Sequence, residues 1–248
     1  MEKRIISKPA PFLQVIRNKP LKKYKTDIKE WLKPVIDLSE FHVYPMNGIT
    51  EGLNYWMLKE KRDIYREKGD YEWVEIKDKW QKAFGKTDYI HYLSCPSSID
   101  GNFREIPKDV PVALDLAYIG STPIQKIEVT PNIEYVFYGL SKPFGVNGVR
   151  TGWFFTRRPD IKLHRLLKLN YYNHIAHAVA EEMIKQYSID FIYNTYRSEQ
   201  ERVCDQYNLL PSDCVWIGTS SDPVYNDFIR ATVARLCLTE YYDNKPYI

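Results

Sequence analysis

The feature that most constrains this fold is a series of short, almost uninterrupted apolar runs between residues 88 and 157. They are DYIHYLS, VPVALDLAY, EYVFYGLS and TGWFFTR, and a more polar run, EWVEIK, comes before them. Runs of this length that are rich in Val, Ile, Tyr and Phe are typical of β-strands, and continuous apolar character indicates strands covered on both faces. The sequence therefore predicts a mainly parallel sheet covered by helices, a three-layer α/β fold.

Helical patterns flank these strands. Residues 22–37 predict a helix interrupted at Pro34, and residues 49–62 predict a helix directly after the strand-like EFHVYPMNG. Two helical segments follow at residues 161–187 and 189–209, before the β-rich CVWIG and ATVARLCL. We expect a helical N-terminal segment (1–40), a large α/β domain (41–160), and connecting helices with a small α+β domain (161–248) that shares a cleft with the large domain.

Composition excludes several classes of function. A net charge of +3 and a charged fraction of 27% are ordinary for a globular chain, and no RNA-binding motif accompanies the short basic cluster KPLKKYK, so a nucleic-acid partner is not expected. No apolar stretch is long enough for a membrane span, which favours a cytoplasmic protein without a membrane partner. The four cysteines and five histidines lack metal-ligand spacing, so we expect reduced thiols and no metal site.

The segment FYGLSKPFGVNGVRTGW carries the strongest indication of chemistry. It contains Ser141 and Lys142, then two glycines, then Arg150. A lysine at a strand end and shielded from water has its amine pKa lowered and becomes a nucleophile toward an aldehyde. Arg150 offers a planar, permanently charged fork that suits a phosphate. A surface lysine and a structural arginine in a glycine-containing loop would, however, look similar.

This segment resembles the Schiff-base lysine motif of fold-type I pyridoxal-phosphate (PLP) enzymes, the aspartate aminotransferase superfamily. A second match in the family's order is Asp115-Leu-Ala-Tyr118, which closes an apolar run. The resemblance implies that Asp115 pairs with the protonated pyridine nitrogen and that the Tyr118 hydroxyl bonds the phenolic oxygen of PLP. The alternative reading of Asp115 is a strand-end residue that caps a turn.

Two further matches extend the resemblance towards both ends of the chain. Asn47-Gly-Ile-Thr-Glu-Gly52 looks like the phosphate cup, which implies that Ile49 and Thr50 bind the phosphate at a helix N-terminus; an ordinary helix cap is the alternative. Ala234-Arg235-Leu-Cys-Leu resembles the strand whose arginine binds the substrate's α-carboxylate. Arg235 might otherwise neutralise a neighbouring acid.

Three positions complete or modify the implied pocket. Tyr71 matches the aromatic residue that stacks on the cofactor ring, with Trp73 as the rival candidate. Ser98 stands where the family has the asparagine of its Asn-Pro-Thr-Gly turn, and the connection from Ser98 to Asp115 is too short for the usual strand-helix-strand unit, so we expect a plain loop. Gly139 stands where the family often has a phosphate-binding Ser or Thr.

The resemblance implies a PLP-dependent aminotransferase that acts on an amino acid or 2-oxo acid, with the cofactor held by Ile49, Thr50, Tyr71, Ser98, Asp115, Tyr118, Ser141, Lys142 and Arg150, and the substrate held by Arg235. Lys142 forms the Schiff base and then moves the proton between Cα and the cofactor. The same chemistry admits a lyase or a decarboxylase, and the shortened chain admits a degenerate PLP-binding protein. Family members are usually homodimers, so a homodimer is implied as well.

Overall fold

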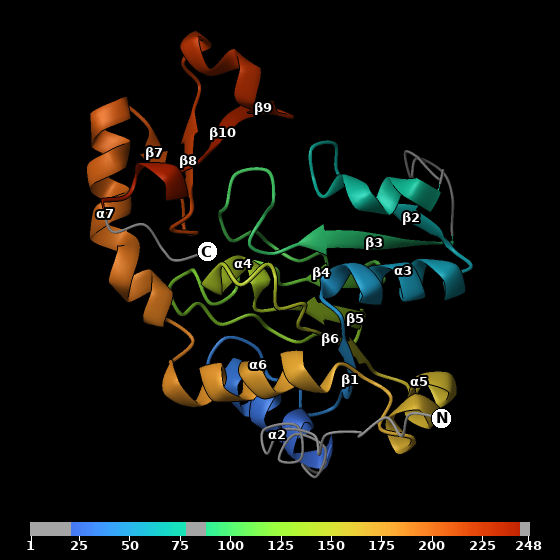
Figure 1. The fold of residues 1–248 in the computed structure, drawn as a ribbon. Helices are drawn as coiled ribbons and strands as arrows, with labels where there is room; N and C mark the ends of the chain where they lie inside the picture. The colour runs from blue at the N-terminus through green and yellow to red at the C-terminus, as the bar shows by residue number, and fades with distance from the viewer. Residues whose placement is uncertain (1–20, 78–87, 244–248) are drawn as a thin grey trace, which may run out of the picture.

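The computed structural model describes residues 21–77 and 88–243, so residues 1–20 of the expected N-terminal segment lie outside the described part. A six-stranded sheet forms the centre of the molecule, with the strand order β1-β6-β5-β4-β3-β2 (Figure 1). Only β6 runs antiparallel to its neighbours; the other pairs are parallel. The strands are β1 (His42–Met46), β2 (Asp63–Tyr65), β3 (Tyr89–Ser94), β4 (Val112–Asp115), β5 (Ile133–Tyr138) and β6 (Gly152–Thr156).

Alternation along each strand sends side chains to two separate cores. On β4, Val112 and Leu114 face the core formed with α2 (Leu21–Leu32) and α6 (His174–Gln186), whereas Ala113 faces the core formed with α3 (Ile49–Lys59) and α5 (Ile161–Lys168). The apolar runs are almost uninterrupted because both faces of these strands are buried. Figure 1 shows α2 and α6 side by side on one face. The prediction of a mainly parallel sheet between helical layers is confirmed.

One predicted strand is wrong. The run EWVEIK forms the 3₁₀ helix η1 (Glu72–Lys77), and the edge of the sheet beside β3 is occupied by β2 instead. Val74 is buried against Trp56 and its neighbours, while Trp73 is 38% exposed. A run that buries one side chain per turn lacks the two-residue alternation that a half-buried strand needs.

The connection between β3 and β4 has no helix or strand, as the shortened spacing predicts. The register of the parallel pair places Ser94 opposite Asp115 at the carboxyl ends of the two strands. Because β3, β4 and β5 are parallel, the loops that follow Ser94, Asp115 and Tyr138 meet at one edge of the sheet. Open α/β sheets bind ligands outside these ends.

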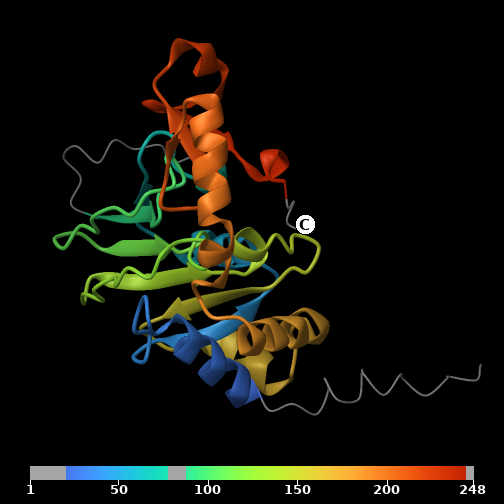
Figure 2. The same cartoon turned by 90° about the vertical axis from the view of Figure 1, so that its left-hand side faces the viewer.

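A smaller antiparallel sheet follows helix α7 (Phe191–Tyr207), in the order β7-β8-β10-β9. Figure 2 shows this sheet at the opposite end of the molecule from α2, α5 and α6, with α7 running from the large sheet towards it. The sheet and α7 share a third core, which includes Val203, Trp216 and Leu238. The domain limits expected at residues 40 and 160 stay a prediction. The strands are β7 (Leu210–Pro211), β8 (Ile217–Ser220), β9 (Ile229–Arg230) and β10 (Val233–Cys237), with the 3₁₀ helices η2 (Pro223–Phe228) and η3 (Thr239–Tyr241).

Candidate active site

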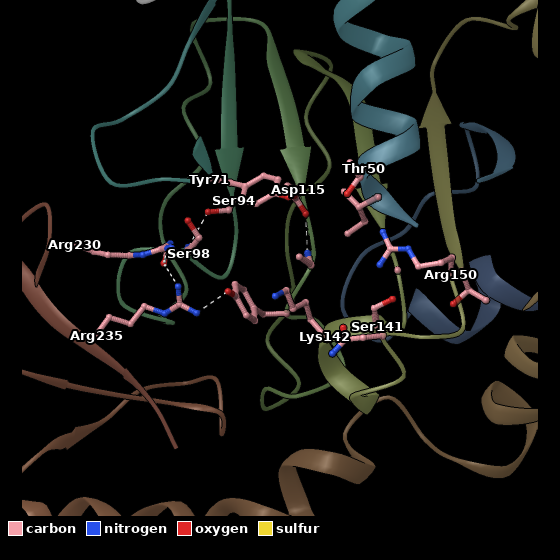
Figure 3. Close-up of a pocket in the computed structure, with 16 residues that line it drawn as sticks. Thr50, Tyr71, Ser94, Ser98, Asp115, Ser141, Lys142, Arg150, Arg230 and Arg235 are labelled. Atoms are coloured by element: carbon pink, nitrogen blue, oxygen red, sulfur yellow. Dashed lines mark hydrogen bonds between the residues drawn. The ribbon is translucent and has the colours of Figure 1, made fainter. Parts of the chain in front are cut away.

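A cavity of about 340 Å³ lies at the carboxyl ends of β3, β4 and β5, and the small sheet supplies part of its wall (Figure 3). Every site residue expected from the sequence lines this one cavity, although these residues come from parts of the chain far apart in sequence. They are Ile49, Thr50, Tyr71, Ser98, Asp115, Tyr118, Ser141, Lys142, Arg150 and Arg235, joined by Ser94, Ala117, Gly139, Asn147, Thr151 and Arg230.

Asp115 is a buried carboxyl group at the end of β4, only 3% exposed. The Tyr92 hydroxyl donates to its Oδ2 at 2.6 Å, and the Ala117 amide donates to its Oδ1 at 2.9 Å. Burial raises the pKa of Asp115 to about 7, and the nearby Asp70 acts in the same direction, whereas the Tyr92 bond lowers it. Asp115 therefore does cap a turn, as the alternative reading holds, and it also presents a carboxyl group that an adjacent cation would hold ionised.

Arg235 reaches from β10 across to the loops of the large sheet. Its Nη2 donates to the Tyr118 hydroxyl at 2.9 Å, and its Nη1 donates to the Ser98 carbonyl oxygen at 3.0 Å. Within residues 21–77 and 88–243, no carboxylate forms an ion pair with Arg235. The alternative in which Arg235 neutralises a neighbouring acid therefore has no support in the described structure, and the guanidinium remains suited to an external anion.

Lys142 differs in surroundings from the sequence prediction. The strand β5 ends at Tyr138, and Lys142 lies on the one-turn helix α4 (Ser141–Phe144), where its side chain is exposed rather than shielded from water. The chain leaves the strand early because it turns into α4, which ends at Gly145 with φ 67°, a left-handed conformation that glycine adopts readily. The expected shielding of Lys142 from water is therefore wrong, while the lysine still lines the cavity.

The N-terminus of α3 and the residues around Arg150 form the wall opposite the small sheet (Figure 3). Gly48 precedes α3 with φ 79°, and a Cβ atom there would lie 2.7 Å from Arg150 Nη2. No side chain caps α3, so Thr50 is not the helix cap of the alternative reading. The unpaired amide groups of a helix N-terminus and a guanidinium both attract an anion, so this wall has the chemistry of a phosphate site.

Two buried hydroxyl groups add to this wall. The Oγ of Ser141 and the Oγ1 of Thr151 have no hydrogen-bond partner among the described residues, although both residues line the cavity. Gly139 has no side chain to contribute, because a Cβ there would lie 2.9 Å from the Thr151 carbonyl oxygen. A buried hydroxyl without a partner costs free energy, so both groups are suited to a hydrogen bond with a polar ligand.

A buried network holds Ser98 and Tyr71 in place. Asp70 is fully buried and accepts hydrogen bonds from Ser98 Oγ at 2.7 Å, from Ser94 Oγ at 2.5 Å and from the Tyr71 amide at 2.7 Å. Arg104, from the short β3–β4 loop, forms an ion pair with it. Burial would raise the pKa of Asp70, but Arg104 and the serine hydroxyls outweigh burial and hold that pKa below its usual value.

The two aromatic candidates are separated clearly. Tyr71 lines the cavity (Figure 3), whereas Trp73 is not among the lining residues and donates from Nε1 to Asn54 Oδ1 at 2.8 Å. Tyr71 directly precedes η1 and Trp73 lies on η1, so the two side chains do not share the face of a strand. Of the two, only Tyr71 is placed to stack on a planar ligand in the cavity.

Several residues of the site carry no signal that the sequence reading used. Tyr92 looks like one more apolar strand position, and Asp70 precedes Tyr71 without a recognisable motif. Arg104 lies in a loop of ordinary composition, and Thr151 stands between two motif residues. The sequence does carry a signal for Arg230, because this residue shortly precedes Arg235 in the chain. In the structure the two arginines lie on one short β-hairpin.

Other kinds of site have no support in the described part of the chain. No cluster of three or more His, Cys, Asp or Glu side chains there is arranged to hold a metal ion. All four cysteines are free thiols. No helix that the structure describes is both long enough and apolar enough to cross a membrane.

No protein-family model and no curated protein matches this sequence, but the fold is similar to known structures. A probable N-succinyldiaminopimelate aminotransferase from Thermus thermophilus matches with a TM-score of 0.64 at 12% identity, over 93% of this chain and 86% of its own. Cystalysin from Treponema denticola, which contains a pyridoxal 5'-phosphate cofactor, matches with 0.63 at 11% identity, over 86% and 73%. L-threonine-O-3-phosphate decarboxylase from Porphyromonas gingivalis matches with 0.58 at 13% identity, over 84% and 74%. At these identities the likeness shows the fold.

Proposed function

We propose that this chain, which has the fold of the fold-type I PLP-dependent enzymes of the aspartate aminotransferase superfamily, binds PLP and transfers an amino group from an amino acid. The observation that carries the proposal is that every residue predicted to bind the cofactor or the substrate lines one cavity at the carboxyl ends of the parallel strands. Motif matches made by chance would be scattered over the surface.

The residues of the cavity fit the cofactor by charge and by hydrogen bonding. A phosphate group requires hydrogen-bond donors and positive charge. The wall around Arg150 would supply both, through the Arg150 guanidinium, the amides and Thr50 hydroxyl at the α3 N-terminus, and the unpartnered hydroxyls of Ser141 and Thr151. Thr151 then replaces the donor that is missing at Gly139. Ile49 lines the same wall at the helix N-terminus.

The ring end of PLP fits the opposite part of the cavity. Asp115 would hold the pyridine nitrogen in its protonated form, Tyr118 and Ser98 would bind the phenolic oxygen, and Tyr71 would stack on the ring; all four residues line the cavity. A pKa of about 7 means that Asp115 ionises readily once a positive charge lies beside it. When bound, PLP supplies the electron sink that stabilises negative charge at the substrate's Cα.

The chain's own groups carry out the remaining tasks. Lys142 would hold the cofactor through its amine, and the same amine would move the proton at the substrate's Cα as general base and general acid. Arg235 orients the substrate through its α-carboxylate, because the guanidinium forms bidentate bonds with carboxylates. Exposure of Lys142 to the cavity leaves its amine accessible for both tasks.

Absorbance and mass spectrometry test the cofactor assignment. Purified protein incubated with PLP is expected to gain a visible absorbance band that borohydride removes, with the added mass on Lys142. Lys142→Ala is expected to lose the band and the adduct, whereas Lys162→Ala, on the exposed side of α5, is expected to keep both. Wild-type protein that stays colourless, or an adduct on another lysine, contradicts the proposal.

Two alternatives use the same site and are separated by the products formed. A lyase or a decarboxylase breaks a different bond at Cα, and one structural neighbour is a decarboxylase. Release of CO₂ or of a side-chain fragment, in place of a stoichiometric 2-oxo acid, would identify that chemistry. Loaded protein that exchanges no α-proton with any amino acid would identify a degenerate PLP-binding protein.

We also propose that the protein is a cytoplasmic homodimer. Sedimentation of the PLP-loaded protein would measure its mass in solution and so test the dimer.

A further inference from the structure

The cavity holds more positive charge than the cofactor and an α-carboxylate require. Four basic side chains line it (Lys142, Arg150, Arg230 and Arg235) against the single carboxyl group of Asp115. Under the proposed function, Lys142 is engaged by the cofactor's aldehyde, Arg150 by its phosphate and Arg235 by the substrate's α-carboxylate. Arg230 then has no anion to pair with.

Arg230 lies beside Arg235 rather than with the phosphate-binding residues. Its Nη1 donates to the Ser98 carbonyl oxygen at 3.3 Å, the same oxygen that Arg235 contacts at 3.0 Å. Figure 3 shows both arginines extending from the small sheet toward Ser98, on the side of the cavity away from Arg150. The pair is therefore placed to meet a substrate, and a cofactor phosphate near Arg150 would be on the other side.

The bonds that Arg230 makes leave most of its hydrogen-bonding capacity unused. A guanidinium carries five N–H donors, and the single contact at 3.3 Å is longer than a typical N–H···O bond. Within the described residues, no ion pair involves Arg230, and its side chain is half-buried. Because a partly buried charge is stabilised by pairing, this arginine is suited to a second anion beside the one on Arg235.

We propose that the substrate is a short amino acid with a second anionic group, a carboxylate or a phosphate, and that Arg230 binds that group. This inference rests on the proposed function, since it takes the cavity to be a PLP site. Both guanidinium groups contact one oxygen atom, so the two anionic groups must be separated by a short chain. A long or apolar side chain would leave the Arg230 charge without a partner.

Calorimetric titration of PLP-loaded protein with unreactive ligands tests the inference. The probes are butyrate, with one carboxylate, succinate, with two, and 3-phosphonopropionate, with a carboxylate and a phosphonate. We expect wild-type protein to bind one of the doubly charged probes at least about tenfold more tightly than butyrate, as a hydrogen-bonded charge pair provides. The tighter of the two identifies the second group as carboxylate or phosphate.

The variants assign the effect to one residue. Arg230→Gln is expected to lose the preference while its butyrate affinity and thermal unfolding midpoint stay unchanged, and Arg230→Lys is expected to keep part of it. Arg165→Gln, on the exposed face of α5, is the matched control and is expected to behave as wild type.

Two results would contradict the inference, and each differs from a failure of the proposed function. Equal affinity of wild-type protein for all three probes overturns the inference. If butyrate affinity falls in Arg230→Gln as much as succinate affinity does, Arg230 shares the α-carboxylate, and the inference is again overturned. Both results leave the proposed function standing, because loading with PLP is confirmed first by the borohydride-trapped mass on Lys142. Failure to load overturns the proposed function together with the inference.

Discussion

The two sides of the cavity are built in different ways. On the side of the large sheet, Asp70 and Asp115 are buried and bonded to neighbours that belong to the core of the fold. On the side of the small sheet, Arg230 and Arg235 are only partly buried and contact a carbonyl oxygen and a hydroxyl group. Substitution of the two buried carboxyl groups should therefore reduce stability, and substitution of the two arginines should reduce binding alone.

The largest expected effect is on the large-sheet side. Asp70→Ala removes the partner of Arg104 and of two serine hydroxyls in a fully buried place. We expect the free energy of unfolding to fall by about 3–5 kcal/mol, as for a broken buried ion pair. Urea denaturation measures this loss. Glu67→Gln, which removes the more exposed partner of Arg104, is the control and should cost under about 1 kcal/mol.

Asp115 provides a pH-dependent test of the same side. Its pKa is raised to about 7 in the folded chain from an ordinary 3.8. The folded state therefore holds the proton more tightly than the unfolded state. The contribution is complete below pH 3.8 and is lost as the pH rises through 7.

Over this range we expect the cofactor-free protein to lose up to about 4 kcal/mol relative to Asp115→Asn, which cannot ionise. Because burial lowers the pKa of His91 and of His177 to about 4, both histidines contribute the opposite slope. The difference between the wild-type protein and the variant removes that contribution. Parallel pH profiles would show that Asp115 titrates normally.

On the small-sheet side, Arg235→Gln should weaken binding and leave folding nearly unchanged. We expect the affinity of loaded protein for butyrate to fall about 10–100-fold, the range for a hydrogen bond to a charged group. The unfolding free energy should change by less than about 1 kcal/mol, because the lost bonds lie at a partly exposed position. A large loss of stability would show that the two sides do not differ in the way described.

The smallest expected effect separates Thr151 from the rest of the large-sheet side. Its hydroxyl has no partner in the described structure, so Thr151→Val removes no existing bond and should leave the unfolding free energy of cofactor-free protein unchanged or slightly higher. The affinity for PLP should fall by about 1 kcal/mol, roughly fivefold. Thr151→Ser should retain the wild-type affinity, and an equal loss in both variants would assign the effect to the methyl group.

The sequence predicts the parts of this molecule that repeat a local pattern. Strand positions such as Val112 and Leu114 belong to apolar runs, and Lys142, Asp115 and Arg235 belong to motifs with recognisable neighbours. The sequence does not determine the conformation of the segment at Trp73, because six residues with mixed polarity fit either a strand or a 3₁₀ helix. Its conformation depends on the sheet edge already being occupied by β2, which is a tertiary fact.

The missed residues share a physical cause. Arg104 and Asp70 become partners only when the β3–β4 loop folds back onto the segment before η1, a contact between residues 34 positions apart. Tyr92 matters through its hydroxyl, yet its ring is what the strand pattern selects. Exposure of Lys142 also depends on where α4 turns, which spacing along the chain does not determine.

The Ser98 carbonyl oxygen is in effect an internal competitor for the substrate. Arg230 and Arg235 already donate to it, so an incoming anion must exchange with a ligand that the protein itself supplies. Apparent affinity then measures the difference between the two sets of bonds, and a substrate that engages both arginines repays the exchange better than one that engages a single arginine. Selectivity of this kind arises before any bond at Cα is broken.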